Sequence, residues 1–275
     1  MNLILLGNGN KPGVQETVEK LRPEIARRAI ILAEDFTGLK DVSAVSADLA
    51  VVFGGDGSIL RAVSQMGTNQ IPVLAVHLGT LSFLSTIRTD ALIPLLERSD
   101  LLQMPVIKHL LLHCRLFRKE QTEPVSWHLA LNEVVLHAEH AAHVIAVELL
   151  LDHQLVTTYR CSGLIVCTPV GSTAMSLSSG GPILRKDIDA IVISPISPHT
   201  LSNRPLVDSP DRFMELRTQQ RAELIVDGNH VAVIEPEDSV RITRASQTFK
   251  TIAVPDYCYY KALRSKLGWN GRFES

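Results

Sequence analysis

The stretch Ala50-Val51-Val52-Phe53-Gly54-Gly55-Asp56-Gly57-Ser58-Ile59-Leu60 decides the fold. Four apolar residues typical of a buried strand run into a turn of three glycines and one carboxylate, and a helical pattern follows, with Ser58 as its expected N-cap. Glycines permit positive φ angles and a close approach to a ligand, and a helix N-terminus offers unpaired N–H groups. The turn therefore suits a phosphate.

Asp56 is the unexpected residue in this turn, because a carboxylate repels a phosphate. The conflict disappears if Asp56 binds a metal, or if it accepts a proton from a hydroxyl that attacks the phosphate. The other interpretation is a plain strand-to-helix turn in which Asp56 is only a turn former. From these residues alone both interpretations stay open.

Composition limits the class of protein. The chain has 275 residues, of which 45% are hydrophobic and 20% charged, so it is long enough for two domains with sizeable cores. A net charge of -2 gives no electrostatic case for nucleic acid or an anionic membrane surface as a partner. The cysteines show no CxxC pair and no metal-ligand spacing, and no apolar run reaches the roughly 18 residues of a membrane span. We expect a cytoplasmic protein with reduced thiols.

Strands alternate with helices in the first hundred residues. This order predicts a parallel sheet covered on both faces, with ligands beyond the C-terminal ends of the strands, where the Gly-Gly-Asp-Gly turn falls. Pro23 is expected to kink or end the first helix. The predicted strands are Leu3–Leu6, Ala29–Ala33, Asp48–Phe53 and Val73–Val76, and the predicted helices are Val14–Arg28, Ile59–Gln65 and Ala91–Leu96.

After about residue 100 the pattern changes to short apolar or alternating runs, among them Trp127–Leu136, Ser239–Arg244 and Thr248–Val254. Asp152-His153 and Asp227-Gly228 are expected hairpin turns. We therefore predict an α/β domain over residues 1–100, a β-rich domain over 101–255, and a helical tail over 256–275 that packs back on the first domain.

Two further stretches carry polar groups. A strand at Gly163–Cys167 leads into a turn rich in glycine, serine and threonine, where hydroxyls at 172, 173, 176 and 178 can line a polar pocket, or merely begin a helix and a surface loop. Asn132-Glu133 interrupts an otherwise apolar strand run. This pair can bind ribose hydroxyls and an adenine edge, or simply mark the end of a strand.

These pieces occur together and in one order, and the order resembles the NAD kinase family over nearly the whole chain. The matching segments are Gly54–Gly57, Asn132–His137, Gly171–Ala174, Ser178–Pro182, Ser194–Leu201 and the ending Asp256-Tyr257 through Lys266–Trp269. The Gly-Gly-Asp-Gly turn alone is weakly specific, because lipid kinases of the diacylglycerol type and phosphofructokinases are similar there. The later segments are much more specific.

The resemblance implies a fold, a reaction and an assembly. The fold is an N-terminal α/β domain with a parallel sheet and a β-rich, sandwich-like C-terminal domain that binds NAD. The reaction transfers the γ-phosphoryl of ATP, or in some members a phosphoryl of polyphosphate, to the 2′-hydroxyl of the adenosine ribose of NAD, with a divalent metal, Mg²⁺, as cofactor. The assembly is a homo-oligomer, a dimer or a tetramer.

Carried over residue by residue, the family pattern makes Asp56 the acceptor of the proton from the 2′-hydroxyl, with Gly57 beside it. Arg61, one helical turn on, matches a ligand-contacting position and can offset phosphate charge. The other matching positions contact the adenosine half, the ribose and the nicotinamide side: Asn132, Glu133, His143, Arg160, Ser162, Thr173, Ala174, Met175, Ser176, Ser178 and Asn229. For His143 and Arg160 an ordinary surface role stays open, and the residues identify no metal ligand.

The chain departs from the family pattern at two of these positions. The usual Arg-x-Asp-Gly is here Arg160-Cys161-Ser162-Gly163, and the usual Thr-Ala-Tyr is Thr173-Ala174-Met175. An aspartate at 162 would attract the positively charged nicotinamide ring and a tyrosine at 175 would stack on a flat ring, whereas serine and methionine do neither. We therefore expect NADH to be accepted relatively better than by typical members.

Two alternatives from other classes remain at this point. A lipid kinase would share the Gly-Gly-Asp-Gly turn, but it has no use for Asn132-Glu133 or the Gly-Ser-Thr-Ala element. A catalytically silent nucleotide-binding regulator would share the fold, but the chain keeps Asp56, Asn132 and Glu133.

Overall fold

The computed structural model describes residues 1–79, 83–84, 87–119, 121–140, 143–200, 203–254 and 258–269. The chain forms two compact units. One contains Met1–Lys108 together with the end of the chain from Phe249, and the other contains His109–Thr248. The expected segment Asp256-Tyr257 lies outside the described residues.

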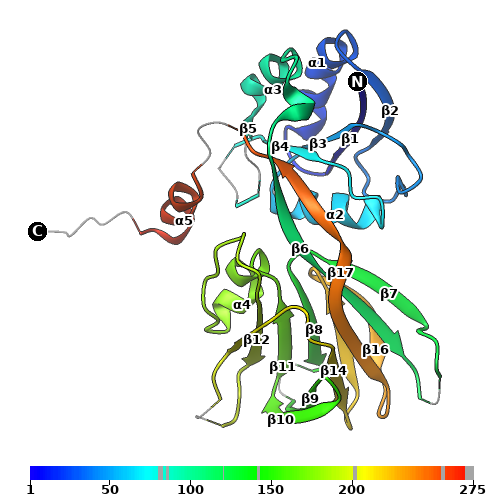
Figure 1. Ribbon diagram of the computed structural model, residues 1–275, viewed down its shortest axis with the longest axis vertical. Helices are drawn as coiled ribbons and strands as arrows, with labels where there is room; N and C mark the ends of the chain where they lie inside the picture. Colours follow the sequence, from blue (N-terminus) through cyan, green and yellow to red (C-terminus); the bar gives the residue numbers. More distant parts are fainter. Residues whose placement is uncertain are drawn as a thin grey trace, which may run out of the picture. The chain divides into compact units, whose positions relative to one another are not determined.

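A parallel sheet forms the centre of the first unit (Figure 1). Its strands lie in the order β2-β1-β3-β4, and short strand β5 and the end of β17 pair with β4, Thr251 opposite Val73. All of these pairings are parallel, as the alternation of strands and helices predicts. The bounds are β1 Asn2–Gly7, β2 Ile30–Asp35, β3 Leu49–Phe53, β4 Val73–His77 and β5 Ile87–Arg88.

Helices cover both faces of this sheet. Helices α1 (Val14–Ala26) and α3 (Thr89–Leu96) bury their apolar sides in one cluster with β1, β3 and β4, and α2 (Asp56–Met66) contacts β1 and β3 from the other face (Figure 1). A short 3-10 helix spans Leu101–Gln103, and α5 spans Tyr259–Leu267. α1 continues past Pro23, so the expected early stop is wrong; Ile25, fully buried in the cluster, anchors the last turn.

The second unit is a sandwich of antiparallel sheets. One sheet has the order β13-β12-β11-β8-β15-β16. In the other, β10, β9, β14, β17, β6 and β7 are neighbours in that order. The bounds are β6 Val106–Phe117, β7 Ser126–Ala130, β8 Glu133–Ala138, β9 Ile145–Leu151, β10 Gln154–Cys161, β11 Gly163–Cys167, β12 Ile191–Ile196, β13 Leu206–Asp208, β14 Met214–Thr218, β15 Ala222–Val226, β16 Asn229–Ile234 and β17 Ser239–Ile252.

Side chains from both sheets fill one core, to which β8 and β11 contribute Leu136 and Leu164, and β9 and β14 contribute Val147 and Leu216. Both hairpin turns are confirmed. Asp152 and His153 have φ angles of 48° and 66°, and Asp227 and Gly228 of 48° and 77°. Two positive angles in succession match the twist of the flanking strands.

Two strand predictions are wrong. The run Trp127–Leu136 is not one strand, because β7 ends at Ala130 and β8 begins at Glu133. The break is stabilised by hydrogen bonds from the backbone of Leu131 and Asn132 to Asp227. Ser239–Arg244 and Thr248–Val254 are not separate, since β17 runs without interruption to Ile252. No helix in the described residues has the length and apolarity that a membrane crossing requires.

Candidate functional site

The Gly-Gly-Asp-Gly turn connects β3 to α2 in the first unit. The helix begins at Asp56 with Gly55 as its N-cap, so the prediction that Ser58 is the cap is wrong. Gly54 has a φ of 135°, and an added Cβ would lie 2.2 Å from the Ser58 hydroxyl oxygen. Only glycine fits there, which lets Ser58 fold back under the turn.

Asp56 occupies the first position of α2, where the positive end of the helix dipole faces its carboxylate. The carboxylate also accepts hydrogen bonds from the backbone N–H of Leu84, at 2.9 Å, and of Phe83, at 3.3 Å. The residue remains partly exposed. These donors orient the carboxylate while leaving it open to a ligand.

Arg61 lies one turn further along α2, exposed and against the loop that follows β2. A Cβ added to Gly38 in that loop would lie 3.1 Å from Cδ of Arg61. Asp35 fixes the loop by accepting hydrogen bonds from Thr37, Gly38 and Lys40, and Gln65 of α2 donates to the same carboxylate at 2.6 Å. Burial raises the pKa of Asp35, but these donors outweigh it and lower the pKa to about 2.

In the second unit, Asn132 and Glu133 stand at the start of β8, and Asp227 holds their backbone. Its carboxylate accepts hydrogen bonds from the N–H groups of Leu131, Asn132 and Glu133 at 2.8, 2.7 and 3.1 Å. Asp227 lies in the hairpin turn between β15 and β16. Three donors from one short segment fix the direction in which both side chains leave the backbone.

Glu133 is only 4% exposed, and its Oε2 has no hydrogen-bond partner among the described residues. Burial raises the pKa of Glu133 to about 8; the charge of Asp227 adds to this, and the Met175 backbone N–H opposes it. Burial also raises the pKa of Asp227, to about 6, against its three backbone donors. Burial therefore favours the neutral form of both carboxyl groups, and the larger shift is at Glu133.

The loop after β11 packs directly on Asn132. The Thr168 hydroxyl donates to the Leu131 carbonyl at 2.5 Å, and the Thr168 N–H donates to the Asn132 carbonyl at 2.9 Å. A Cβ added to Gly171 would lie 2.1 Å from the same Asn132 oxygen. The backbone of the Gly-Ser-Thr-Ala turn thus touches that of Asn132, and glycine alone permits this approach.

The side chains of this turn face different surroundings. Ser176 is fully buried, and its hydroxyl hydrogen-bonds that of Ser194 at 3.1 Å. Met175 packs against an apolar cluster that includes Val135 and Cys167. The others are more accessible: Thr173, Ala174 and Ser178 are partly or fully exposed, and the hydroxyls of Thr173 and Ser178 donate to nearby carbonyls.

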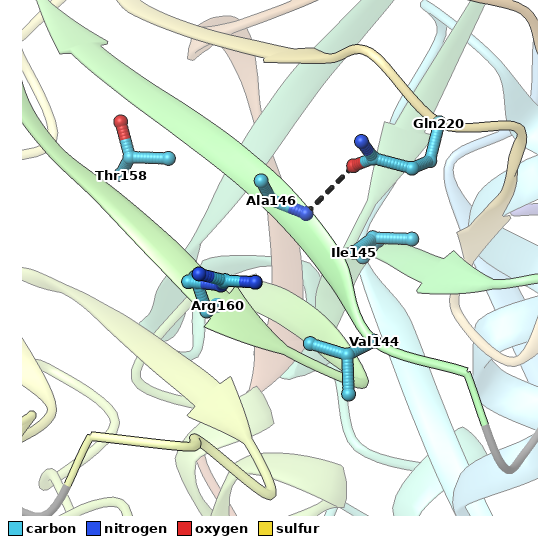
Figure 2. Close-up of a pocket in the computed structure, with 6 residues that line it drawn as sticks. All are labelled: Val144, Ile145, Ala146, Thr158, Arg160 and Gln220. Atoms are coloured by element: carbon cyan, nitrogen blue, oxygen red, sulfur yellow. Dashed lines mark hydrogen bonds between the residues drawn. The ribbon is translucent and has the colours of Figure 1, made fainter.

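Arg160 lines a cavity of about 300 Å³ on the second unit (Figure 2). Thr158 and Arg160 of β10 and Val144–Ala146 at the start of β9 form its walls, and the Ala146 N–H donates to Gln220 at 2.8 Å. His143 lines a neighbouring cavity of about 470 Å³, with its ring edge-on to His140.

The backbone of Ser162 is held on both sides, because its N–H donates to Ile196 and its carbonyl accepts from Ala138. Asn229 is exposed and donates to the carbonyl of Asp227 at 3.3 Å. The structure therefore packs the turn at 171–178 on Asn132, whose backbone Asp227 holds. Arg160 of β10 and His143, which precedes β9, both lie beside the start of β9. Asp56, Gly57 and Arg61 lie in the first unit.

Sequence reasoning missed the groups that support these residues. The donors to Asp56 come from Phe83 and Leu84, and the residue that holds Asn132-Glu133 is Asp227. An Asp-Gly pair between two strands indicates a hairpin, and the sequence was sufficient for that. It contains no signal for a contact between Asp227 and a segment 94 to 96 positions earlier in the chain.

A glycine-rich turn on a parallel sheet and a polar site on a β-sandwich suit a two-domain protein that binds phosphate-containing small molecules. Solved structures share this fold. The crystal structure of yeast NADH kinase complexed with NADH matches with a TM-score of 0.86 and 23% identity, covering 99% of this chain and 89% of that one. An NAD kinase from Archaeoglobus fulgidus in complex with ATP matches with a TM-score of 0.77 and 21% identity, covering 98% and 99%.

Sequence comparison gives the family. Residues 11–99 match the ATP-NAD kinase N-terminal domain, and residues 131–254 match the ATP-NAD kinase C-terminal domain. An NAD kinase of Rhodopirellula baltica is 42% identical over 98% of this chain and 87% of its own length, and one of Geotalea daltonii is 34% identical over 98% and 91%. The chain belongs to the ATP-NAD kinase family. This membership does not support the lipid-kinase alternative.

Proposed function

We propose that the protein is an NAD kinase, which transfers the γ-phosphoryl of ATP to the 2′-hydroxyl of the adenosine ribose of NAD and releases NADP and ADP. The observation that carries the proposal is the match to both domain models of the family, over residues 11–99 and 131–254. Polyphosphate is the alternative donor. We further propose a cytoplasmic homo-oligomer, a dimer or a tetramer.

Asp56 acts as the general base in this proposal. Its partly exposed carboxylate, oriented by two backbone N–H groups, takes the proton as the 2′-hydroxyl attacks the γ-phosphorus. Gly57 is exposed, and an added Cβ would meet nothing within 4 Å among the described residues outside its own helix, so the substrate can approach the helix end closely. Arg61 offsets phosphate charge.

In this proposal the second unit binds NAD. Asn132 and Glu133 contact the adenosine half, and the turn from Thr173 to Ser178, with Ala174, Met175 and Ser176, contacts the ribose and nicotinamide side. His143, Arg160, Ser162 and Asn229 add polar contacts. The fixed backbone at Asn132 supports the first assignment, as does the buried oxygen of Glu133, which has no partner in the part of the chain that the structure describes.

The cofactor is Mg²⁺ that arrives with ATP. Among the described residues no group of three or more His, Cys, Asp and Glu side chains is placed to hold a metal ion. Mg²⁺ commonly takes most of its ligands from water and substrate phosphates. The bound ion would supply charge neutralisation at the phosphates.

The test is direct. The purified protein is incubated with ATP, Mg²⁺ and NAD, and the product is assayed with an NADP-specific dehydrogenase, which reports phosphate at the 2′ position. Diacylglycerol replaces NAD in a parallel reaction. We expect NADP and no phosphatidate; a protein that binds NAD but forms no NADP would be the silent regulator, and phosphatidate would revive the lipid-kinase interpretation.

A further inference from the structure

Asp227 has no place in the proposed chemistry, yet its surroundings are unusual for a hairpin residue. It adopts a left-handed conformation with a φ of 48°, and its carboxylate accepts three backbone N–H groups from residues 131–133, which precede it by more than ninety positions. A turn former needs none of these bonds. They connect the β15–β16 hairpin to the segment that carries Asn132 and Glu133.

We propose that Asp227 is a positioning residue for NAD: it fixes the backbone of Asn132-Glu133 and thereby directs the buried Glu133 carboxyl, as a hydrogen-bond donor, at the adenosine half. The inference rests on the proposed contact between Glu133 and NAD. It assigns to a buried acid the role of a hydrogen-bond donor; burial is the main reason that its pKa is raised, and the charge of Asp227 adds to it.

The groups that face Glu133 come from different elements. Asp227 faces it from the β15–β16 turn, and the Met175 N–H faces it from the start of the short helix α4 (Met175–Ser178). Cys167 faces it from β11, directly across the strand pair, with a thiol whose pKa burial raises to about 12 and which stays neutral. Asp227 thus brings a negative charge, and it favours the protonated form of Glu133.

A pH dependence follows. The pKa of Asp227 is about 6 and that of Glu133 about 8, so between these values Asp227 is ionised and Glu133 holds the proton. Above about pH 8 Glu133 loses its proton and with it the donor. The dissociation constant for NAD should therefore rise as the pH passes through this value, by about tenfold or more, the effect of losing one hydrogen bond in a buried site.

The variant Asp227→Asn tests the inference. Asparagine has the shape of aspartate but no charge. Its NH₂ group replaces one of the two oxygens that accept hydrogen bonds from the backbone N–H groups, so an acceptor is lost. We expect the dissociation constant for NAD, measured by calorimetry without ATP, to rise about tenfold or more at pH 7. Its alkaline rise should move to lower pH, because Glu133 then ionises more readily. KM for NAD should follow, with a smaller change in kcat.

Asp238→Asn is the matched control. Asp238 is 3% exposed and accepts backbone N–H groups from Glu235 at 2.8 Å and Lys119 at 3.3 Å in the same unit. Its loss should lower the melting temperature without changing the NAD dissociation constant or the pH of its rise. If Asp227→Asn changes NAD binding no more than this control does, the inference is overturned.

Two substitutions of Glu133 separate the inference from the proposed function. If Glu133→Ala leaves NAD affinity unchanged, the contact between Glu133 and NAD is wrong, and the inference falls with it. If Glu133→Ala weakens binding, Glu133→Gln becomes decisive even where Asp227→Asn fails to fold. Glutamine donates at every pH, so the alkaline rise must disappear, and its persistence would overturn the inference.

Discussion

Asp56 and Glu133 are both carboxylates assigned to the same substrate, and their surroundings are opposite. Asp56 is partly exposed, stands at a helix N-terminus and accepts two backbone hydrogen bonds. Glu133 is 4% exposed, has one oxygen without a partner among the described residues, and faces a second carboxylate. The first environment favours a negative charge and the second disfavours it.

The difference shows how one chain uses the same functional group in two roles. A general base must be free of its proton before the reaction, and a hydrogen-bond donor must keep it. Solvent-exposed surroundings with N–H donors keep Asp56 ionised, as a base requires. Burial beside another carboxyl group keeps Glu133 neutral, as a donor requires. The predictions below test each half of this contrast.

The largest effect is expected at the base. Asp56→Asn keeps an oxygen that can accept from Leu84 but removes the ability to take a proton, so kcat should fall by about 10²–10⁴-fold. The melting temperature and the dissociation constant for NAD should change little. Near-normal turnover of a folded Asp56→Asn enzyme would remove Asp56 from the chemistry and, with it, the contrast between base and donor.

A second prediction concerns how tightly each site is built. Gly171→Ala places a Cβ 2.1 Å from the Asn132 carbonyl, so the chain must shift. Overpacking of this kind typically destabilises by about 1–3 kcal/mol, and the displaced Asn132 should weaken NAD binding as well. The measurements are chemical denaturation and NAD calorimetry.

Gly57→Ala provides the matched substitution at the open site. Outside its own helix, no described residue lies within 4 Å of the added Cβ. Gly57 is inside α2, where alanine should raise the free energy of unfolding by about 0.5–1 kcal/mol. If the two variants change the free energy of unfolding equally, the backbone at Gly171 accommodates an added Cβ as easily as the backbone at Gly57, and the expected difference between the two sites is wrong.

The sequence was sufficient for the parts of this contrast that depend on local pattern. Three glycines around Asp56 predict the turn, and alternating strands and helices predict the parallel sheet beneath it. Two details were predicted wrongly because the local pattern was misleading. Ser58 has the chemistry of a helix N-cap, and the run through Asn132 has the pattern of one continuous strand. At the helix the backbone of Gly55 takes the cap position, and at the strand break a distant contact with Asp227 decides the outcome. Such contacts leave no periodic trace in a sequence.

Asp35 shows whether burial or hydrogen bonding decides the charge of a carboxylate in this protein. It is 7% exposed, and its donors lower its pKa to about 2 from 3.8 against the opposing effect of burial. A pKa that is lower in the folded state stabilises the fold above the unfolded value, and this stability is lost as the pH falls from about 4 towards 2. Asp35→Asn should cost about 2 kcal/mol at pH 7 and much less at pH 2.

Urea denaturation from pH 2 to 7 measures this loss. Asp41→Asn is the control, because Asp41 is an exposed carboxylate in the same loop that accepts from the Ser43 N–H. It should have little effect at any pH. If the difference in the free energy of unfolding between wild type and Asp35→Asn is the same at every pH, the carboxyl group contributes through its shape and hydrogen bonds and not through its charge.

The smallest effect is expected where this chain lacks a carboxylate that its family usually has. Ser162 is partly exposed, and its backbone is bonded to Ile196 at 2.9 Å and to Ala138 at 2.8 Å, so a change of side chain should leave the strand in place. Ser162→Asp adds a charge that attracts the positive nicotinamide ring of NAD and not the neutral ring of NADH. The ratio of kcat/KM for NAD to that for NADH should rise several-fold, the equivalent of about 1 kcal/mol for one exposed charge pair.

The control for this ratio is Ser246→Asp, which adds the same charge at an exposed position of β17 outside the proposed site. It should leave the ratio at its wild-type value. A charge at 162 can discriminate between the two nucleotides only if it lies near the nicotinamide ring, because screening by salt removes the effect beyond about 10 Å. A ratio that is unchanged in Ser162→Asp would therefore place the ring elsewhere and leave Ser162 with no role beyond filling space.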